Sequence, residues 1–389
     1  KSFDANGFTL GTDVQVNTLN ESYVAWCWKA AGTAPTQTYV VKVVSDSGNK
    51  YRFDDFGTSA VALDLQEGGT YTFNMDDSSN ETHPFSIGTA ANDTVYTSGI
   101  TYFLDGVSKT YAQYTSGFAA ATTRRLIFTV PASAPALYYW CSAHSGMGGA
   151  VNTNSTFGSS NFAGSIQSRV TAAEHGGFSI VTHTGSGANA TVGHGLDRAP
   201  NFTMHKNTET TDQWISHSSF LATPTTQYLH PNRTLGVQSS GATFFNSTVP
   251  SASVLSFGSN SAVNGSSQVN VHYCFAKTPG LIGLGSYHGN GDANGPHVIV
   301  DDGAFGFKPA WVMIHRCDSD DEWVIVDNVR DPANVTKHYV SMDYPDAERT
   351  TGTQVELDFV ANGFKLRVSH GRCNADGGPY IYIAMAEEP

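Results

Sequence analysis

Residues 137–149 read Leu137-Tyr138-Tyr139-Trp140-Cys141-Ser142-Ala143-His144-Ser145-Gly146-Met147-Gly148-Gly149. The aromatic first half of this stretch is typical of a buried strand, and the glycine-rich second half is typical of a tight hairpin. Cys141 ends the strand, and His144 and Met147 follow within six residues. With one more histidine, these side chains make up a His2Cys metal site with a weak axial thioether, a ligand set that suits copper.

The residues before this stretch predict an antiparallel β-sandwich. Apolar residues alternate with polar or small ones in several short segments, and helical periodicity is almost absent. The expected strands cover residues 38–44, 51–53, 61–65, 71–75 and 125–130. Turn residues separate them, so we expect one sandwich over residues 33–155, with residues 137–149 as its closing hairpin.

The C-terminal part of the chain repeats itself. Pro309 and Trp323 lie 109 residues after Pro200 and Trp214, within similar apolar surroundings. A fixed period of this size is typical of tandem structural modules. We therefore expect one β-module at residues 156–278 and a second at residues 279–389.

The first 32 residues match only the back half of such a module. Cys274 follows Cys27 by 247 residues, and the glycines ahead of the two cysteines keep the same spacing. Residues 1–32 hold a turn, a strand, a polar loop and a second apolar strand at 22–29, which is too little to bury a core. We expect them to be the C-terminal half of a truncated module whose front half is missing. The expected fold is all-β, with tandem β-sandwich modules.

Composition and charge exclude several classes of protein. Lys and Arg number 21 against 34 Asp and Glu, a net charge of −13, and no basic stripe occurs. Nucleic acid is therefore not an expected partner, because phosphate contacts require clustered cations. The five cysteines are too scattered for a disulfide scaffold. No run of about 18 apolar residues occurs, so we expect no membrane insertion.

Residues of about 36–153 resemble a cupredoxin. The resemblance rests on the Gly-Gly-Thr-Tyr-Thr-Phe strand at 68–73, the His83-Pro84-Phe85 turn and the Cys-x2-His-x2-Met hairpin at 141–147. It implies a cupredoxin-like sandwich and copper as a cofactor.

Carried over position by position, the resemblance implies type 1 copper ligands. His83 and His144 would supply imidazole nitrogens, Cys141 the thiolate and Met147 the axial sulfur. The alternative is purely structural, with Cys141 as a buried thiol and Met147 as core filler. Both interpretations remain open at the level of sequence.

Other candidate sites have simpler interpretations. The acidic run Asp318–Glu322 is typical of a solvated turn, although it could bind a cation. Residues 290–295 resemble a calcium loop but lack the downstream Glu of an EF-hand. Four histidines of one module show no helical spacing: His175, His183, His194 and His205. No nucleophile elbow or Walker loop occurs, so we expect no enzymatic activity.

The repeat modules carry a second resemblance. Residues 154–162, 176–181 and 192–196 resemble modules of large virion proteins of marine tailed phages. Cupredoxin-like domains are interspersed between repeats in those proteins too. The similarity covers most of the chain, including residues 1–32.

This resemblance implies a structural virion protein. The first expectation is a tail fibre or appendage component on the virion surface. β-Sandwich beads joined by short polar connectors would form a stiff rod. The expected partners are further copies of this chain, other virion proteins, and a glycan or protein receptor on the host surface. For the homo-oligomer we assume a trimer. The alternatives are a capsid decoration or head-fibre protein, and a copper-binding redox protein of the cupredoxin type.

Overall fold

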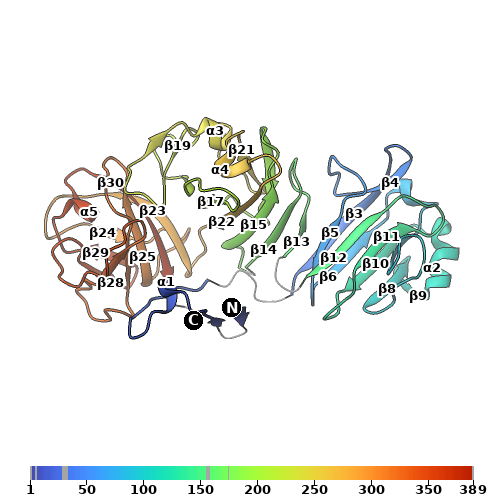
Figure 1. The fold of residues 1–389 in the computed structure, drawn as a ribbon, viewed down its shortest axis with the longest axis horizontal. Coiled ribbons are helices and arrows are strands. Elements are labelled where there is room, and N and C mark those ends of the chain that lie inside the picture. The colour runs from blue at the N-terminus through green and yellow to red at the C-terminus, as the bar shows by residue number, and fades with distance from the viewer. Residues whose placement is uncertain (1, 5–6, 29–33, 155–157, 174, 388–389) are drawn as a thin grey trace.

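The computed structural model describes residues 2–4, 7–28, 34–154, 158–173 and 175–387. The predicted all-β fold is confirmed, since sheets account for most of the regular structure and helices are short. Figure 1 shows three lobes, which follow one another from blue-cyan through green-yellow to red. The expected domain boundaries at 32/33 and 155/156 lie outside the described residues.

The first sandwich comprises residues 34–154 and has two sheets. The larger sheet has the order β4-β3-β6-β10-β8-β9 and the smaller one β5-β12-β11-β7. The strands are β3 (Thr36–Ser45), β4 (Asn49–Phe53), β5 (Leu63–Gln66), β6 (Thr70–Asn74), β7 (Phe85–Gly88), β8 (Ile100–Leu104), β9 (Val107–Lys109), β10 (Arg124–Thr129), β11 (Leu137–Cys141) and β12 (Gly149–Asn154). Three helical turns join them: η1 (Ser78–Asn80), α2 (Tyr111–Gly117) and η2 (Phe118–Ala120).

Aromatic rings fill the space between these two sheets. Phe85 stacks on Phe73 and on Tyr139 at centroid distances of 4.8 and 5.5 Å, which are favourable separations for offset rings. Helix α2 was not expected from the sequence. Thr110 caps it with a complete capping box, and Tyr114 is its buried residue.

The second module comprises residues 158–278. Its large sheet has the order β13-β14-β15-β22-β17-β18, and β16-β21 and β19-β20 are separate pairs. The strands are β13 (Ser159–Asn161), β14 (Ser168–Ala172), β15 (Phe178–Thr184), β16 (Ala190–Gly193), β17 (Phe202–Asn207), β18 (Ile215–Ser218), β19 (Gln227–Tyr228), β20 (Gln238–Ser239), β21 (Val254–Phe257) and β22 (Val269–Phe275). Its helices are α3 (Ala242–Phe245) and α4 (Ser261–Asn264).

The third module comprises residues 279–387 and follows the same plan. Its large sheet has the order β23-β30-β25-β26-β27, and its small sheet has the order β24-β29-β28. The strands are β23 (Ile282–His288), β24 (His297–Ile299), β25 (Pro309–Arg316), β26 (Val324–Asp327), β27 (Tyr339–Ser341), β28 (Leu357–Val360), β29 (Gly363–Leu366) and β30 (Pro379–Ala386). The short helix α5 (Gly371–Asn374) occupies the place of α4.

The second and third modules pack against each other through their large sheets. One hydrophobic cluster joins the two outer faces, with Phe202 and Phe275 from one module and Trp311 and Ile383 from the other. The picture of beads joined by polar connectors is therefore wrong for this pair. The outer face of each large sheet is apolar and needs a partner, and each module supplies the partner of the other.

The first sandwich also contacts the second module directly. Phe162 of the second module is buried in the core of the sandwich, with its ring 5.6 Å from those of Tyr39 and Phe53. Tyr39 Oη donates a hydrogen bond to the Ser160 carbonyl at 2.9 Å. Because an aromatic side chain crosses the boundary, the two lobes are not joined by a linker alone.

Residues 7–28 contain little regular structure. The hairpin β1 (Ser2–Asp4) and β2 (Gly7–Thr9) precedes the short helix α1 (Val14–Asn17). The apolar strand expected at 22–29 is not formed: residues 21–28 are neither helix nor strand, and Lys29 lies outside the described residues. A strand needs a neighbour for its hydrogen bonds, and no described strand pairs with this segment.

Candidate metal centre

Strand pairing brings the two ends of the predicted metal site together. Cys141 is the last residue of β11 and lies opposite Phe85, the first residue of β7. His83 precedes β7 by two residues. The Ser142 amide donates a hydrogen bond to the Pro84 carbonyl at 3.0 Å and continues the contact beyond the strands. The antiparallel register therefore places His83 beside the Cys141 thiol.

Tyr51 on β4 holds both loops of the site. Its hydroxyl donates to the His83 carbonyl at 2.8 Å, and its amide donates to the Met147 carbonyl at 3.0 Å. Gly148 completes the hairpin, because a Cβ at this position would lie 1.7 Å from the Tyr139 carbonyl oxygen. Only glycine permits this close approach, which brings Met147 back to the core.

The three potential ligand atoms of His83, Cys141 and His144 lie within 4.8 Å of one another. Cys141 Sγ is 3.8 Å from Nδ1 of His83 and 3.7 Å from Nδ1 of His144. With metal–nitrogen and metal–sulfur bonds of about 2.0 and 2.3 Å, a trigonal plane requires a sulfur–nitrogen separation of about 3.7 Å and a tetrahedron about 3.5 Å. Both observed separations are close to these values, so the three side chains can hold one metal ion.

Burial differs among the four predicted ligands. His83, Cys141 and Met147 are buried, whereas His144 is exposed at the rim of the site. Burial, and next the nearby His144, lower the pKa of His83, so its imidazole is neutral at neutral pH and offers a lone pair to a metal. His83 Nε2 lies 3.4 Å from the side-chain amide of Asn49, which can orient the ring.

The cluster of His83, Cys141 and His144 can therefore hold a metal ion. Met147 belongs to the same hydrophobic core as Cys141, with its backbone tied to Tyr51. Three of the four ligands expected from the sequence therefore lie together. The fourth, Met147, is buried in the same core and lies on the same loop as His144.

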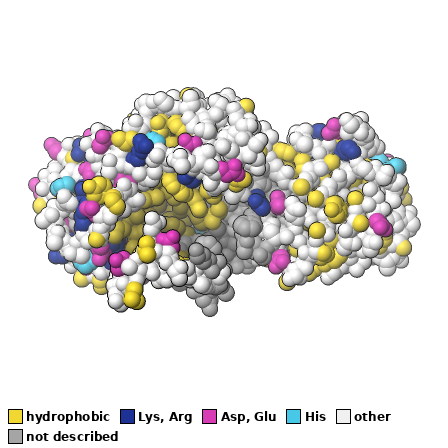
Figure 2. All heavy atoms as spheres, viewed as in Figure 1, with side chains coloured by type: hydrophobic (Ala, Val, Ile, Leu, Met, Phe, Trp, Pro, Cys, Tyr) yellow, Lys and Arg dark blue, Asp and Glu magenta, His cyan; other side chains and the backbone are white. Residues whose placement is uncertain are grey.

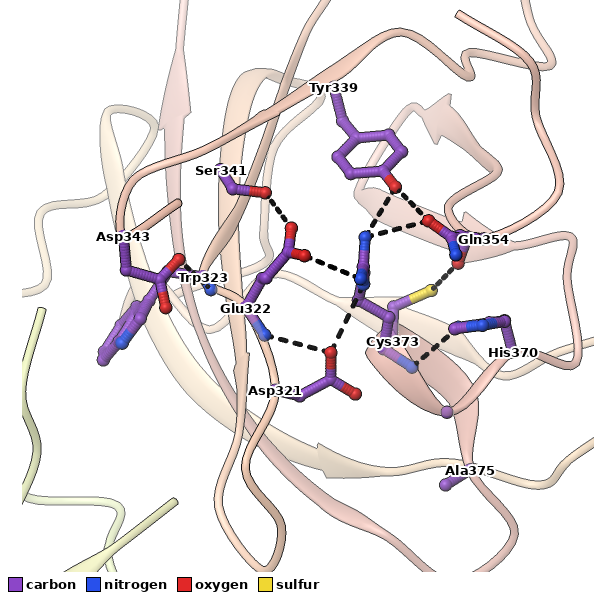
Figure 3. Close-up of polar contacts among 12 residues, drawn as sticks. Asp321, Glu322, Trp323, Tyr339, Ser341, Asp343, Gln354, His370, Cys373 and Ala375 are labelled. Carbon is purple, nitrogen blue, oxygen red and sulfur yellow. Dashed lines mark hydrogen bonds and ion pairs between the residues drawn. The ribbon is translucent and has the colours of Figure 1, made fainter. Parts of the chain in front are cut away.

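The acidic run Asp318–Glu322 has a structural role at its C-terminal end. Glu322 is buried and pairs with Arg349 and Arg372, with the closest contacts at 2.6 and 2.7 Å. Figure 3 shows its carboxylate between the Ser341 hydroxyl and this network, with Asp321 alongside. The run is therefore not simply a solvated turn, because arginines distant in sequence neutralise its last residues.

The calcium-like loop at residues 290–295 is closed by its own hydrogen bonds. Asn290 Oδ1 accepts from the Asp292 amide at 3.1 Å, and Asp292 Oδ1 accepts from the Asn294 amide at 2.7 Å. Asn374 also accepts from the Asn290 amide at 2.8 Å. The side chains that could bind a cation instead stabilise the turn.

The four histidines of the second module have different positions. His175 and His194 stabilise turns, since each Nδ1 accepts from the amide two residues later. His183 and His205 are buried and lie on either side of His272, which the sequence analysis did not single out. His183 Nδ1 is 2.8 Å from His272 Nε2, and His205 Nδ1 is 2.9 Å from His272 Nδ1.

Asn264 determines the proton positions in this histidine chain. Its amide nitrogen donates to the carbonyls of Ala188 and Gly258, so its oxygen is the acceptor that faces His183 Nε2 at 3.4 Å. His183 must then carry its proton on Nε2, and its Nδ1 accepts from His272 Nε2. By the same reasoning, His272 Nδ1 accepts from His205 Nδ1.

The chain ends at Thr203, whose hydroxyl is 2.6 Å from His205 Nε2 and donates to it. Each of the three imidazoles thus carries one proton and is neutral. Burial lowers the pKa of His183 to about 4, and it lowers the pKa values of His205 and His272 well below their usual value. The nitrogens form a linear chain rather than a converging ligand set, so this cluster does not resemble a metal site.

A family model described as a domain of unknown function (DUF7483) matches residues 1–54 and 150–389. The match covers more than half of the sequence. The chain belongs to this family. The unmatched residues 55–149 contain His83, Cys141, His144 and Met147 and most of the first sandwich. The family match therefore includes β3, β4 and nearly all of β12 of the first sandwich as well as the second and third modules, and the candidate metal ligands lie in the part between.

No curated protein and no solved structure matches the chain significantly. Within the described ranges, no helix is long and apolar enough to cross a membrane.

Proposed function

We propose that this protein is a structural component of a virion appendage. The appendage we favour is a tail fibre that contacts the host surface. The observation that carries the proposal is the continuous packing between lobes. The second and third modules share one apolar core, and Phe162 joins the second module to the first sandwich. An appendage must transmit force without unfolding, and apolar contacts between lobes make such a body stiff.

The surface chemistry is compatible with this role. Aromatic side chains such as Tyr138 and Tyr344 are exposed, and rings of this kind can stack on sugars of a host glycan. The acidic net charge of −13 disfavours contact with nucleic acid inside a capsid.

Localisation on the particle tests the proposal. Gold-labelled antibody against residues 158–387 should mark an appendage in electron micrographs of purified virions, and the antibody should block adsorption to host cells. Labelling over the capsid surface would instead indicate a decoration or head-fibre protein. Labelling only in disrupted particles would refute a surface role.

A second proposal concerns the first sandwich, which we infer to bind copper through His83, Cys141, His144 and Met147. The sulfur–nitrogen separations of 3.8 and 3.7 Å are short enough for one ion to bind all three side chains. A donor set of two imidazoles, one thiolate and one thioether is typical of a type 1 copper site. When bound, copper supplies one-electron transfer chemistry. The protein contributes a buried thiol, an imidazole kept neutral and loops held by Tyr51.

Copper titration with visible spectroscopy tests this site. The protein should develop an intense thiolate-to-copper absorption at one equivalent, and Cys141→Ser should abolish it. Cys27→Ser is the matched control, because Cys27 is an exposed thiol in residues 7–28 and should not affect the absorption. Copper binding without the absorption would exclude thiolate ligation.

The Cys141→Ser variant also separates the two proposals. If the appendage role is structural, virions carrying the variant assemble and adsorb normally. If a copper redox role is the main function, the variant loses function although it assembles. The substitution replaces one sulfur atom with a smaller oxygen atom and leaves the rest of the side chain unchanged, so it should leave the sandwich folded.

A further inference from the structure

Residues 7–28 reproduce a local structure that occurs in both complete modules. In each case an asparagine ends a short helix and its side-chain amide donates to the carbonyl six residues earlier. The three bonds are Asn17 to Gly11 at 2.7 Å, Asn264 to Gly258 at 3.0 Å and Asn374 to Val368 at 2.8 Å. The sequence repeat is therefore also a structural repeat in residues 7–28.

The segment after this asparagine is the central strand of each complete module. Strand β22 lies between β15 and β17, and β30 lies between β23 and β25. One face of each strand enters the shared inter-module core, with Phe275 and Met385 at equivalent positions. Trp28 is the third equivalent, and its ring lies 6.2 Å from Phe275 and 5.6 Å from Trp311. Residues 22–28 thus present the same outer face to the same core.

The opposite face is covered in the complete modules and uncovered in residues 22–28. Cys274 and Ala384 are fully buried, whereas Cys27 at the matching position is exposed. Strand β2 behaves in the same way, because Phe8 is 41% exposed, whereas its counterparts Leu255 on β21 and Phe364 on β29 are 2% and 0% exposed. Residues 7–28 therefore carry the inner surface of a sandwich without its other half.

The shared core also has a hollow beside residues 22–28. In the complete modules, Met204 on β17 and Met313 on β25 fill this core from the strands beside β22 and β30. Both methionines line an apolar cavity beside residues 22–28, together with Trp26, Trp28 and Trp311. Figure 2 shows hydrophobic side chains gathered around a hollow between the second and third modules.

We propose that residues 7–28 are a docking face for the front half of a module of this same repeat. The occupant has strands equivalent to β23 and β25, which would pair with residues 22–28 and fill the hollow, and a strand equivalent to β26 beyond the second of them. Both complete modules have their front half before the strands equivalent to β2, which are β21 and β29, so we place the occupant on the N-terminal side of residues 1–389 in a longer polypeptide. The inference is independent of the proposed virion role.

A second copy of residues 1–389 does not fit the docking face. It would offer another back half at 7–28, and its complete modules already use their front halves to pair with β22 and β30. Completing the face from such a copy would require one of those sheets to open.

Thiol labelling tests the docking face. Cys27 is exposed, whereas Cys141, Cys274 and Cys373 are buried and serve as internal references. Residues 1–389 should react at Cys27 with maleimide under native conditions, as read by mass spectrometry. The full-length polypeptide should react at Cys27 at least about tenfold more slowly, because a closed sandwich shields this position. Equal rates, or a gene product without such a segment, would overturn the proposal.

A pair of substitutions gives an independent readout. Ala25→Glu places a charge on the uncovered face, where the equivalent His272 and Tyr382 are buried. It should leave the melting temperature of residues 1–389 unchanged and lower that of the full-length polypeptide by several degrees. Val107→Glu, at an exposed position of the first sandwich, should change neither. Protection of Cys27 in residues 1–389 that rises with dimer formation would identify a second copy as the occupant and overturn the proposal.

Discussion

The second and third modules hold the same short helix and the same asparagine, yet they close their cores with different chemistry. Where the second module has the chain Thr203, His205, His272 and His183, the third has Val312, Ile314, Tyr382 and Tyr287. Asn264 and Asn374 make equivalent backbone bonds in both.

The difference shows that the same fold can place either a chain of histidines or a set of aliphatic and tyrosine side chains at equivalent core positions. In the third module the tyrosine hydroxyls reach backbone atoms at the edge, as Tyr287 does with the Cys373 carbonyl at 2.7 Å. In the second module the polar atoms bond to one another inside the core. A fully satisfied polar network is stable, but it depends on every member and on each proton. The second module should therefore be more sensitive to substitution and to pH.

The largest expected effect separates two equivalent tryptophans. Trp323 is fully buried, and its Nε1 donates to the His230 carbonyl at 3.0 Å, whereas Trp214 is only partly buried. Trp323→Ala should lower the free energy of unfolding by about 4 kcal/mol, and Trp214→Ala by less than half of that. Urea unfolding of both variants measures the difference. Equal losses of unfolding free energy would show that Trp214 contributes as much to stability as Trp323, although it is less buried.

The middle of the histidine chain should be more sensitive than its counterpart. His272→Phe removes the partner of both His183 and His205, so it should cost about 3 kcal/mol. Tyr382→Phe removes one hydroxyl that accepts from the Asp301 amide and should cost about 1 kcal/mol. Both variants introduce the same side chain into equivalent strands, which makes them a matched pair in thermal or urea unfolding. A smaller loss for His272→Phe would contradict the chain.

The stability of the second module should depend on pH below about 6.5. Burial keeps the folded pKa of His183 at about 4, below its usual value of 6.5. Between these values the unfolded chain binds a proton that the folded module does not, so stability falls as pH falls through this window. His183 alone accounts for up to about 3 kcal/mol.

The control for this pH dependence copies the third module. The variant H183Y/H205I/H272Y carries Tyr287, Ile314 and Tyr382 into the equivalent positions, and it should show a shallower loss of stability between pH 6.5 and 4. His217 and His315, whose pKa values burial lowers to about 4 and about 3, remain and should retain part of the slope. An unchanged slope would show that other groups dominate.

The smallest effect concerns the end of the chain. Thr203→Val copies Val312 of the third module and removes the donor to His205 Nε2, so it should cost about 1 kcal/mol. Nitrogen-15 NMR of the imidazoles should show His205 protonated on Nδ1, and His183 and His272 on Nε2. The opposite tautomers would contradict the direction of hydrogen bonding that Asn264 imposes.

Local patterns allowed several features to be predicted. Alternating apolar residues predicted the strands that became β3, β6 and β10, because one buried face imposes a period of two. The spacing of Cys141, His144 and Met147 predicted the hairpin of the candidate metal site, since all three lie within seven residues at the end of β11. His83 could be assigned only through the cupredoxin resemblance, because its approach to Cys141 depends on the pairing of β7 with β11.

Other features depended on contacts that no local pattern records. His272 became part of a chain only because β22 pairs with β15 and β17 in a particular register. The predicted strand at 22–29 did not form, although its apolar pattern matches β22, because backbone hydrogen bonds need a neighbouring strand. The arginines that neutralise Glu322 follow it by 27 and 50 residues.

By itself, the sequence determined the all-β class, the repeat with its 109-residue period and three of the potential metal ligands, Cys141, His144 and Met147, because each of these follows from spacing along the chain. The tertiary structure alone decided that the second and third modules share a core, that three imidazoles join into one chain and that residues 7–28 have an uncovered face. The physical reason is that burial and hydrogen bonding between distant segments depend on which strands become neighbours, and pairing of that kind is a property of the whole fold.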